Sequence, residues 1–318
     1  MGPTPSTAAD PVLNIVTVHW RSPKWIDPQL GYLERNVDVP YRVFASLNGI
    51  VDPRRRERFH LAEDLEGTHA EKLNALAALV VEQSDPEDRL LFLDGDAFPV
   101  RPVGAWMDEM LRSHPLAAVR RDENLGDRQP HPCFALTTCR FWQELGGDWR
   151  EGGTWVNSAG ETTTDVGGTL LHQLADGGHR WLPLGRTNTH NPDPLWFGVY
   201  AHRVYHHGAG FRPPVSRVGG HADLTRLRSG TATAWGTSVE GLARRVAGQP
   251  SLVTRVRPHD LPMIGRAVQV SMGKQRRRWG EWRRAHRQQR TEAQLQAMFA
   301  RLETDPEFYT ALDDTPLG

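Results

Sequence analysis

Residues 89–100 read RLLFLDGDAFPV, and this stretch decides the fold that the sequence predicts. The four apolar residues 90–93 are typical of a short strand buried on both faces, as in a parallel sheet covered by helices. The run stops at Asp94 and Asp96, which a single glycine separates. Ligands of open α/β sheets bind beyond the carboxyl ends of the strands, so these two carboxylates are the first candidate site.

The segments before this stretch alternate between two kinds of pattern. Residues 14–20 (NIVTVHW) and 41–50 (YRVFASLNGI) are rich in β-branched and aromatic residues and predict strands. Between residues 68 and 83, Thr68 and Glu71 have the spacing of a capping box ahead of apolar residues at helical intervals. The alternation predicts an α/β fold, with a mostly parallel, Rossmann-like sheet flanked by helices.

The segments after residue 100 continue this pattern less regularly. We expect a helix over 104–113, strands over 116–120 and 134–138, a loop over 152–164, a helix opening at Asp165 and a late strand over 195–207. Beyond about residue 220 the chain changes character and predicts helices only. The expected organisation is a disordered leader over 1–12, a catalytic domain over 13–218 and a helical C-terminal region over 219–318.

Composition excludes several classes of protein. The 318 residues carry 38 basic and 38 acidic side chains, which is ordinary for a soluble globular protein and gives no reason to expect nucleic acid as a partner. Two cysteines exclude a disulfide framework and a zinc site built mainly from thiolates, and they favour a reducing cytoplasm. No apolar run approaches the roughly 20 residues that span a bilayer.

Charge is concentrated in one C-terminal segment. Residues 274–290 hold eight basic side chains and one acidic one, a local balance of +7 that leaves −7 elsewhere. Trp279 and Trp282 share one helical face, so the segment reads either as a solvated helix packed through its tryptophans or as a surface for anionic lipid or a polyanion. The second interpretation predicts peripheral contact with the inner face of the membrane.

The carboxylate pair in this context resembles the metal- and nucleotide-sugar-binding Asp-x-Asp motif of glycosyltransferases with the GT-A fold. Residues 68–74 (THAEKLN) resemble the helix that precedes that motif, and residues 205–213 (YHHGAGFRP) are similar to the His-x-x-Gly-x-x-Lys-Pro segment of glycogenin-like transferases. His207 has the right spacing to Gly210, although Arg212 replaces the lysine and arrives one residue early, which leaves His206 as the alternative. The resemblance spans residues 13–214.

The resemblance implies a hexosyltransferase that uses Mn²⁺ or Mg²⁺. Its donor would be a nucleoside-diphosphate sugar, with a UDP-sugar as the favoured candidate, and its acceptor is unidentified. The metal would be held by Asp94, Asp96 and His207. Lys72 and Arg212 would face the diphosphate, and His19, Trp20 and Asn48 would contact the nucleoside, with Asp94 shared between metal and ribose.

The residue that activates the acceptor hydroxyl has two candidates. Asp165 opens a helix after a threonine-rich loop, where it is either a helix cap or the general base of an inverting enzyme. Glu161 is the alternative base. Retaining enzymes need no such base, so the sequence leaves the stereochemistry open.

Other interpretations compete with this one. A phosphatase of the haloacid dehalogenase type also has an apolar strand ending in Asp-x-Asp, but near its N-terminus. A sugar nucleotidyltransferase should have a glycine-rich loop after the first strand, where this chain has His19-Trp20-Arg21-Ser22. A non-enzymatic binder would act through residues 274–290 and would not need carboxylates at a strand end.

Overall fold

The computed structural model describes residues 11–124, 126–158, 160–188, 198–208, 210–211, 293, 297, 300 and 301. The helices are α1 Ile26–Asn36, α2 Pro53–Arg56, α3 His69–Gln83, α4 Gly104–Ser113, α5 Cys139–Leu145 and α6 Gly168–Asp176. The strands are β1 Leu13–Val18, β2 Tyr41–Ser46, β3 Leu61–Glu63, β4 Arg89–Phe92, β5 Ala97–Pro99, β6 Leu116–Val119, β7 His131–Thr138, β8 Trp155–Val156, β9 Thr162–Thr163, β10 Leu182–Leu184, β11 Gly198–Tyr200 and β12 Val204–His206.

A seven-stranded sheet in the order β10-β6-β7-β4-β1-β2-β3 forms the centre of the fold. The pairs β4–β1, β1–β2, β2–β3 and β10–β6 are parallel, and β7 runs antiparallel to both β4 and β6. The predicted α/β class with a mostly parallel sheet flanked by helices is therefore confirmed.

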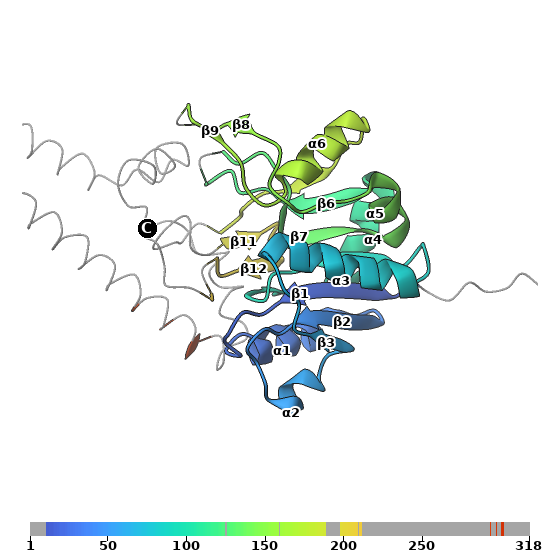
Figure 1. Ribbon diagram of the computed structural model, residues 1–318, viewed down its shortest axis with the longest axis vertical. Coiled ribbons are helices and arrows are strands. Elements are labelled where there is room, and N and C mark those ends of the chain that lie inside the picture. The colour runs from blue at the N-terminus through green and yellow to red at the C-terminus, as the bar shows by residue number, and fades with distance from the viewer. Residues whose placement is uncertain are drawn as a thin grey trace, which may run out of the picture. The chain divides into compact units, whose positions relative to one another are not determined.

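Helices cover both faces of this sheet because successive strand residues point to opposite sides. Leu13 and Ile15 of β1 pack with apolar residues of α1 and α4, whereas Val16 and Val18 pack with those of α3, α5 and α6. Figure 1 shows α3 lying across the face of the sheet that is turned toward the viewer. All residues of β4 are buried, as the apolar run predicted.

The capping box predicted for the helix over 68–83 is present at the start of α3. The Thr68 hydroxyl accepts a hydrogen bond from the Glu71 backbone N–H at 3.3 Å, and Oε2 of Glu71 accepts one from the Thr68 N–H at 2.7 Å. This cap fixes the first turn of α3, which carries His69 and Lys72. Both side chains matter for the site described below.

The short strand expected over 90–93 is β4, and after the acidic residues β5 pairs with β12 in a second sheet of order β11-β12-β5. Two predictions about later segments need correction. The described part of 195–207 is a hairpin, with positive φ at Ala201 and His202 turning β11 into β12. The predicted loop over 152–164 contains the β8–β9 hairpin.

Several predictions fall outside the described residues. They are the leader as far as residue 10, the domain boundary at 218, the basic segment 274–290 and Arg212. Of the C-terminal region over 219–318, the structure describes Ala293, Ala297, Ala300 and Arg301, all helical. Among the described helices, none combines the length and the apolar character that a membrane span requires.

Candidate metal centre and its surroundings

The two carboxylates lie in the turn that carries the chain from β4 into β5. The Leu93 N–H still donates to the Val16 carbonyl of β1 at 2.9 Å, and the chain then turns, with the Ala97 N–H donating to the Asp94 carbonyl at 2.9 Å. Asp94 and Asp96 are both buried. The acidic turn therefore stands at the carboxyl end of a central strand, where α/β folds bind ligands.

Glycine is required between the two carboxylates because the turn presses against β1. A Cβ atom added to Gly95 would lie 2.5 Å from the Val18 carbonyl oxygen and 2.9 Å from Cζ of Phe211. Either distance is shorter than a carbon atom tolerates. The turn can approach β1 this closely only without a side chain at residue 95.

Gln29 of α1 holds the acidic turn in place. Its amide Nε2 donates to the carbonyls of Asp94 and Ala97 at 2.8 and 2.9 Å, and its Oε1 lies 3.0 Å from Nε2 of His19. His19 is fully buried, and burial lowers its pKa to about 4, so the ring is neutral at neutral pH. Among the described residues, its Nδ1 has no hydrogen-bond partner.

A histidine from β12 completes a group of three metal-type ligands. Nε2 of His206 lies 3.5 Å from Oδ2 of Asp94 and 3.5 Å from Oδ1 of Asp96. One ligand atom from each residue lies within 4.8 Å of the others. Two carboxylates and one imidazole form a donor set that suits Mn²⁺ or a similar divalent ion.

His207, which the spacing favoured as the ligand, lies on the opposite side of β12 from His206. Its Nδ1 is 2.7 Å from the Tyr205 hydroxyl, and its ring centroid is 4.5 Å from that of Trp25. Side chains alternate along a strand, so only one of two adjacent histidines can face the acidic turn. The backbone N–H of His207 nevertheless helps to hold that turn, because it donates to the Asp96 carbonyl at 3.0 Å.

Burial controls the charge of the group. The pKa of Asp94 is raised well above its usual value, mainly because the carboxyl group is buried and also because the charge of Asp96 is close to it. Burial also lowers the pKa of His206 to about 4, which leaves its ring neutral. Two carboxylates and a neutral imidazole favour binding of a cation, because a cation offsets the repulsion that opposes ionisation of Asp94.

We expect His206→Ala and His207→Ala to separate a ligand from a packing residue. His206→Ala should abolish Mn²⁺-dependent binding of nucleoside diphosphate. His207→Ala should keep that binding and lose about 1–3 kcal/mol of stability, because the Tyr205 hydroxyl loses a buried partner. Calorimetric titration and thermal melting measure the two effects. Loss of binding in His207→Ala alone would reverse the assignment.

Asp94→Asn should stabilise the metal-free protein at high pH. The folded-state pKa of Asp94 is raised, so its ionisation costs stability as the pH rises above the unfolded value of about 4. In EDTA at pH 8, the melting temperature of the variant should exceed that of wild type, by about 2–4 °C for each kcal/mol gained in the free energy of unfolding. This difference in melting temperature should shrink on acidification. A difference that grows on acidification would contradict this reasoning.

A second group of side chains stands at the carboxyl ends of β1 and β2. Nζ of Lys72 donates to Oδ1 of Asn48 at 2.7 Å and lies 4.1 Å from the centroid of the Trp20 ring. The Asn48 amide in turn donates to the Leu65 carbonyl at 2.8 Å. Trp20 is 39% exposed, which leaves part of its ring open to a ligand.

The first turn of α3 joins this group to the acidic turn. Nε2 of His69 lies 3.1 Å from Oδ1 of Asp94, and Lys72, three residues later, donates to Asn48. Residues i and i+3 share one face of a helix, so α3 presents both side chains toward the same edge of the sheet. The structure thus connects the predicted nucleotide residues to the predicted metal residues.

Asp165 does not open a helix, contrary to the sequence prediction. Helix α6 starts at Gly168 with Gly167 as its cap residue, and Oδ1 of Asp165 accepts from the Val166 N–H at 2.8 Å. Burial lowers the pKa of His69, and the negative charge of Asp165 partly opposes this lowering. Asp165 therefore lies within electrostatic reach of the residue that contacts Asp94.

Glu161 belongs to the β8–β9 hairpin. Its carboxylate accepts from the side-chain amide of Asn157 at 3.2 Å, and its backbone N–H donates to Oδ1 of Asn157 at 3.0 Å. The side chain is exposed. Electrostatic contact of Glu161 with the acidic turn is not seen among the described residues.

Sequence reasoning missed three residues that shape the site: Gln29, His69 and Arg121. His69 lies in the quoted stretch 68–74, and its place one turn before Lys72 was the available signal. The charge of Arg121 opposes the rise in the pKa of Asp94, and its Nη1 lies 3.1 Å from Nε2 of His131. Nothing in the local sequence distinguishes Gln29 or Arg121 from other polar residues.

No protein-family description matches the chain, and no curated protein matches it. Among solved structures, the mannosyltransferase PcManGT from Pyrobaculum calidifontis, in complex with GDP-Man and Mn²⁺, is 15% identical, with a TM-score of 0.38 over 54% of this chain and 54% of its own. S. aureus TarS 1-349 is 15% identical, with a TM-score of 0.32 over 43% and 50%. The galactosyltransferase LgtC is 16% identical, with a TM-score of 0.30 over 41% and 59%. The chain thus spans little more than half of these structures.

Proposed function

We propose that this protein is a metal-dependent glycosyltransferase that moves a hexosyl group from a nucleoside-diphosphate sugar to an acceptor hydroxyl. A UDP-sugar is the favoured donor. The observation that carries the proposal is the buried group of Asp94, Asp96 and His206 at the carboxyl end of β4, joined through α3 to Lys72. A leaving diphosphate needs positive charge where its own negative charge develops. This edge of the sheet offers a cation site and a lysine.

The donor set fits a divalent metal of the Mn²⁺ or Mg²⁺ kind. Asp94 and Asp96 supply oxygen ligands, and burial keeps the imidazole of His206 neutral, so its lone pair is available. When bound, the ion would neutralise the diphosphate oxygens as the bond to the sugar breaks. His207, the ligand that the spacing favoured, would instead hold the acidic turn through its backbone N–H, which donates to the Asp96 carbonyl.

The nucleoside would bind beside Trp20, with its base on the open part of the ring. Lys72 and Asn48 are held together by a hydrogen bond, and Nζ of Lys72 lies 4.1 Å from the centroid of the Trp20 ring. His19 would not contact the nucleoside directly, because it is fully buried, and it would position the acidic turn through Gln29. Arg212 stays a prediction for the diphosphate and lies outside the described residues.

Trp20→Ala tests the nucleoside assignment. Stacking of a base on an aromatic ring contributes about 1–3 kcal/mol, so affinity for the nucleoside diphosphate should fall roughly 5- to 150-fold, and Trp20→Phe should restore most of it. Titration with UDP in the presence of Mn²⁺ measures the affinities. Unchanged affinity in Trp20→Ala would remove this residue from the donor site.

Thermal melting with a panel of nucleotide sugars tests the function itself. A ligand that binds only the folded state raises the melting temperature, and one donor should do so with Mn²⁺ present but not in EDTA. That donor should then lose its sugar to an acceptor under turnover conditions. Stabilisation by every donor in EDTA, or by none with Mn²⁺ or Mg²⁺, would overturn the proposal.

A further inference from the structure

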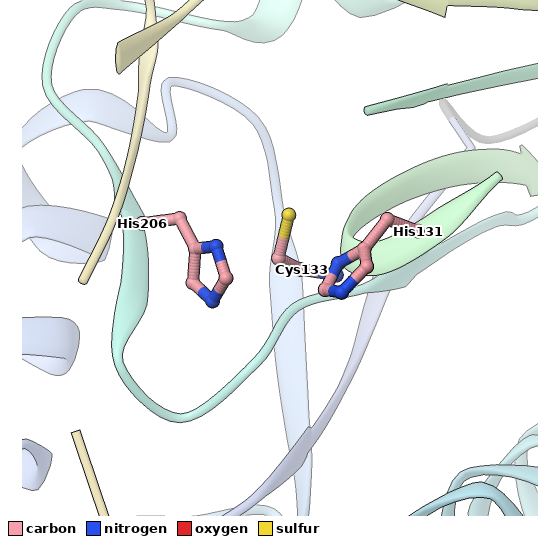
Figure 2. Close-up of side chains that lie close together, drawn as sticks. All are labelled: His131, Cys133 and His206. Atoms are coloured by element: carbon pink, nitrogen blue, oxygen red, sulfur yellow. The ribbon is translucent and has the colours of Figure 1, made fainter. Parts of the chain in front are cut away.

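His206 has a second set of neighbours, which come from β7. His131 and Cys133 stand two residues apart on β7 and therefore share one face of that strand. Figure 2 shows the Cys133 sulfur between the rings of His131 and His206. One ligand atom from each of these three residues lies within 4.8 Å of the others, and the two rings are 5.5 Å apart.

This donor set differs in chemical character from the acidic one. Asp94 and Asp96 offer hard oxygen atoms, whereas Cys133 offers sulfur, and thiolate with imidazole selects Zn²⁺ or a similar borderline-soft ion. We propose that His131, Cys133 and His206 form a second metal site, selective for ions of the Zn²⁺ class, that shares His206 with the Asp94–Asp96 group. Because a neutral imidazole has only one nitrogen with a free lone pair, His206 can serve one ion at a time, and the two sites exclude one another.

Both ring nitrogens of His131 face a hydrogen-bond donor. Nδ1 faces the backbone N–H of Cys133 at 3.1 Å, and Nε2 faces Nη1 of Arg121 at 3.1 Å. A neutral imidazole has only one acceptor nitrogen, so the other carries a proton that points at a donor. A metal at that nitrogen would remove this unfavourable contact between two N–H groups, and the donor that now faces the nitrogen would have to move to make room for the ion.

Charges of both signs lie near this group. The positive charge of Arg121 opposes a cation at His131, and the negative charges of Glu123 and Asp127 act on Arg121 and partly offset it. Cys133 is fully buried, and its thiol would release one proton to solvent as the sulfur–metal bond forms, so binding should strengthen as the pH rises.

Cobalt in place of zinc gives a direct test. Co²⁺ bound to a thiolate produces a sulfur-to-metal charge-transfer absorption that oxygen and nitrogen ligands do not. We expect this band in wild type and in Cys139→Ser but not in Cys133→Ser. Cys139 is the matched control because it is the other buried cysteine and lies at the start of α5, outside both metal groups. A folded wild type without the band, or a band that depends on Cys139, would overturn the proposal.

A second measurement serves if Cys133→Ser does not fold. In Cys139→Ser the only remaining thiol is Cys133, so its alkylation rate reports this site alone. Zn²⁺ at a few micromolar should slow alkylation at least tenfold, whereas Mg²⁺ should not. Equal rates with and without Zn²⁺ would refute the site.

Competition tests the shared ligand. Zn²⁺ should displace Mn²⁺ from the protein, and the electron spin resonance signal of the released Mn²⁺ measures this displacement. Cys133→Ser should raise the Zn²⁺ concentration required for displacement by about 10- to 100-fold or more. Simultaneous binding of both ions would contradict the sharing of His206. Inhibition of sugar transfer by Zn²⁺ follows only if the proposed function is correct, whereas the cobalt band and the alkylation rate are independent of it.

Discussion

Asp96→Asn is expected to reduce sugar transfer and Mn²⁺-dependent donor binding by at least about 100-fold, more than the 10- to 100-fold typical of residues that only orient a metal ligand. Oδ2 of Asp96 accepts a hydrogen bond from the Gly210 N–H at 2.9 Å, and asparagine keeps an oxygen for this bond. The change therefore removes charge and leaves the contact. Asp96→Ala would remove both the charge and this contact of a buried side chain.

The matched control is Asp108→Asn. Asp108 of α4 forms an ion pair with Arg89 at the opposite end of the same strand, β4. The control removes one carboxylate near β4 without touching the acidic turn, so donor binding should stay normal. Calorimetric titration of UDP with Mn²⁺ and with EDTA measures both variants. Wild-type affinity in Asp96→Asn, with Mn²⁺ still required, would eliminate Asp96 as a ligand.

Asp165→Asn is expected to lower turnover by about 10²–10⁴-fold while donor affinity stays unchanged. In an inverting reaction a base must take the proton of the acceptor hydroxyl as the anomeric carbon is attacked. Asparagine keeps the oxygen that accepts from the Val166 N–H but cannot take a proton. Stability should change little, because the carbonyl of residue 165 still accepts from the Gly168 N–H.

Glu161→Gln is the comparison that decides between the two candidate bases. Its amide can keep the contact with Asn157, so the hairpin should fold, and we expect near-normal turnover. The opposite pattern, with turnover lost in Glu161→Gln and kept in Asp165→Asn, would transfer the role to Glu161. Normal turnover in both variants would indicate a retaining mechanism, which the anomeric configuration of the product, read by NMR, would confirm.

Elements defined by short-range signals were predictable from the sequence. The capping box of α3, the apolar run of β4 and the β-branched strands β1 and β2 depend on residues within a few positions of one another. In such segments, local propensity and burial favour the same structure. The requirement for glycine between Asp94 and Asp96 does not belong to this class, because it arises from contacts with Val18 of β1 and with Phe211.

Elements held by distant partners were not predictable in this way. Helix α1 was missed, although its Gln29 supports the acidic turn, because its role depends on carbonyls far along the chain. The sequence also predicted no separate strand after the two carboxylates. Only pairing with β12 carries β5 into a second sheet.

By itself the sequence determined the class of the fold, the position of two carboxylates at the end of a buried strand and the helix that carries Lys72. Tertiary structure alone decided which histidine joins them. His206 and His207 are chemically identical neighbours, and the choice between them depends on the register with which β12 pairs with β5. A shift of one residue would exchange the faces of the strand, since side chains alternate, and that register is set by contacts between segments far apart in the chain.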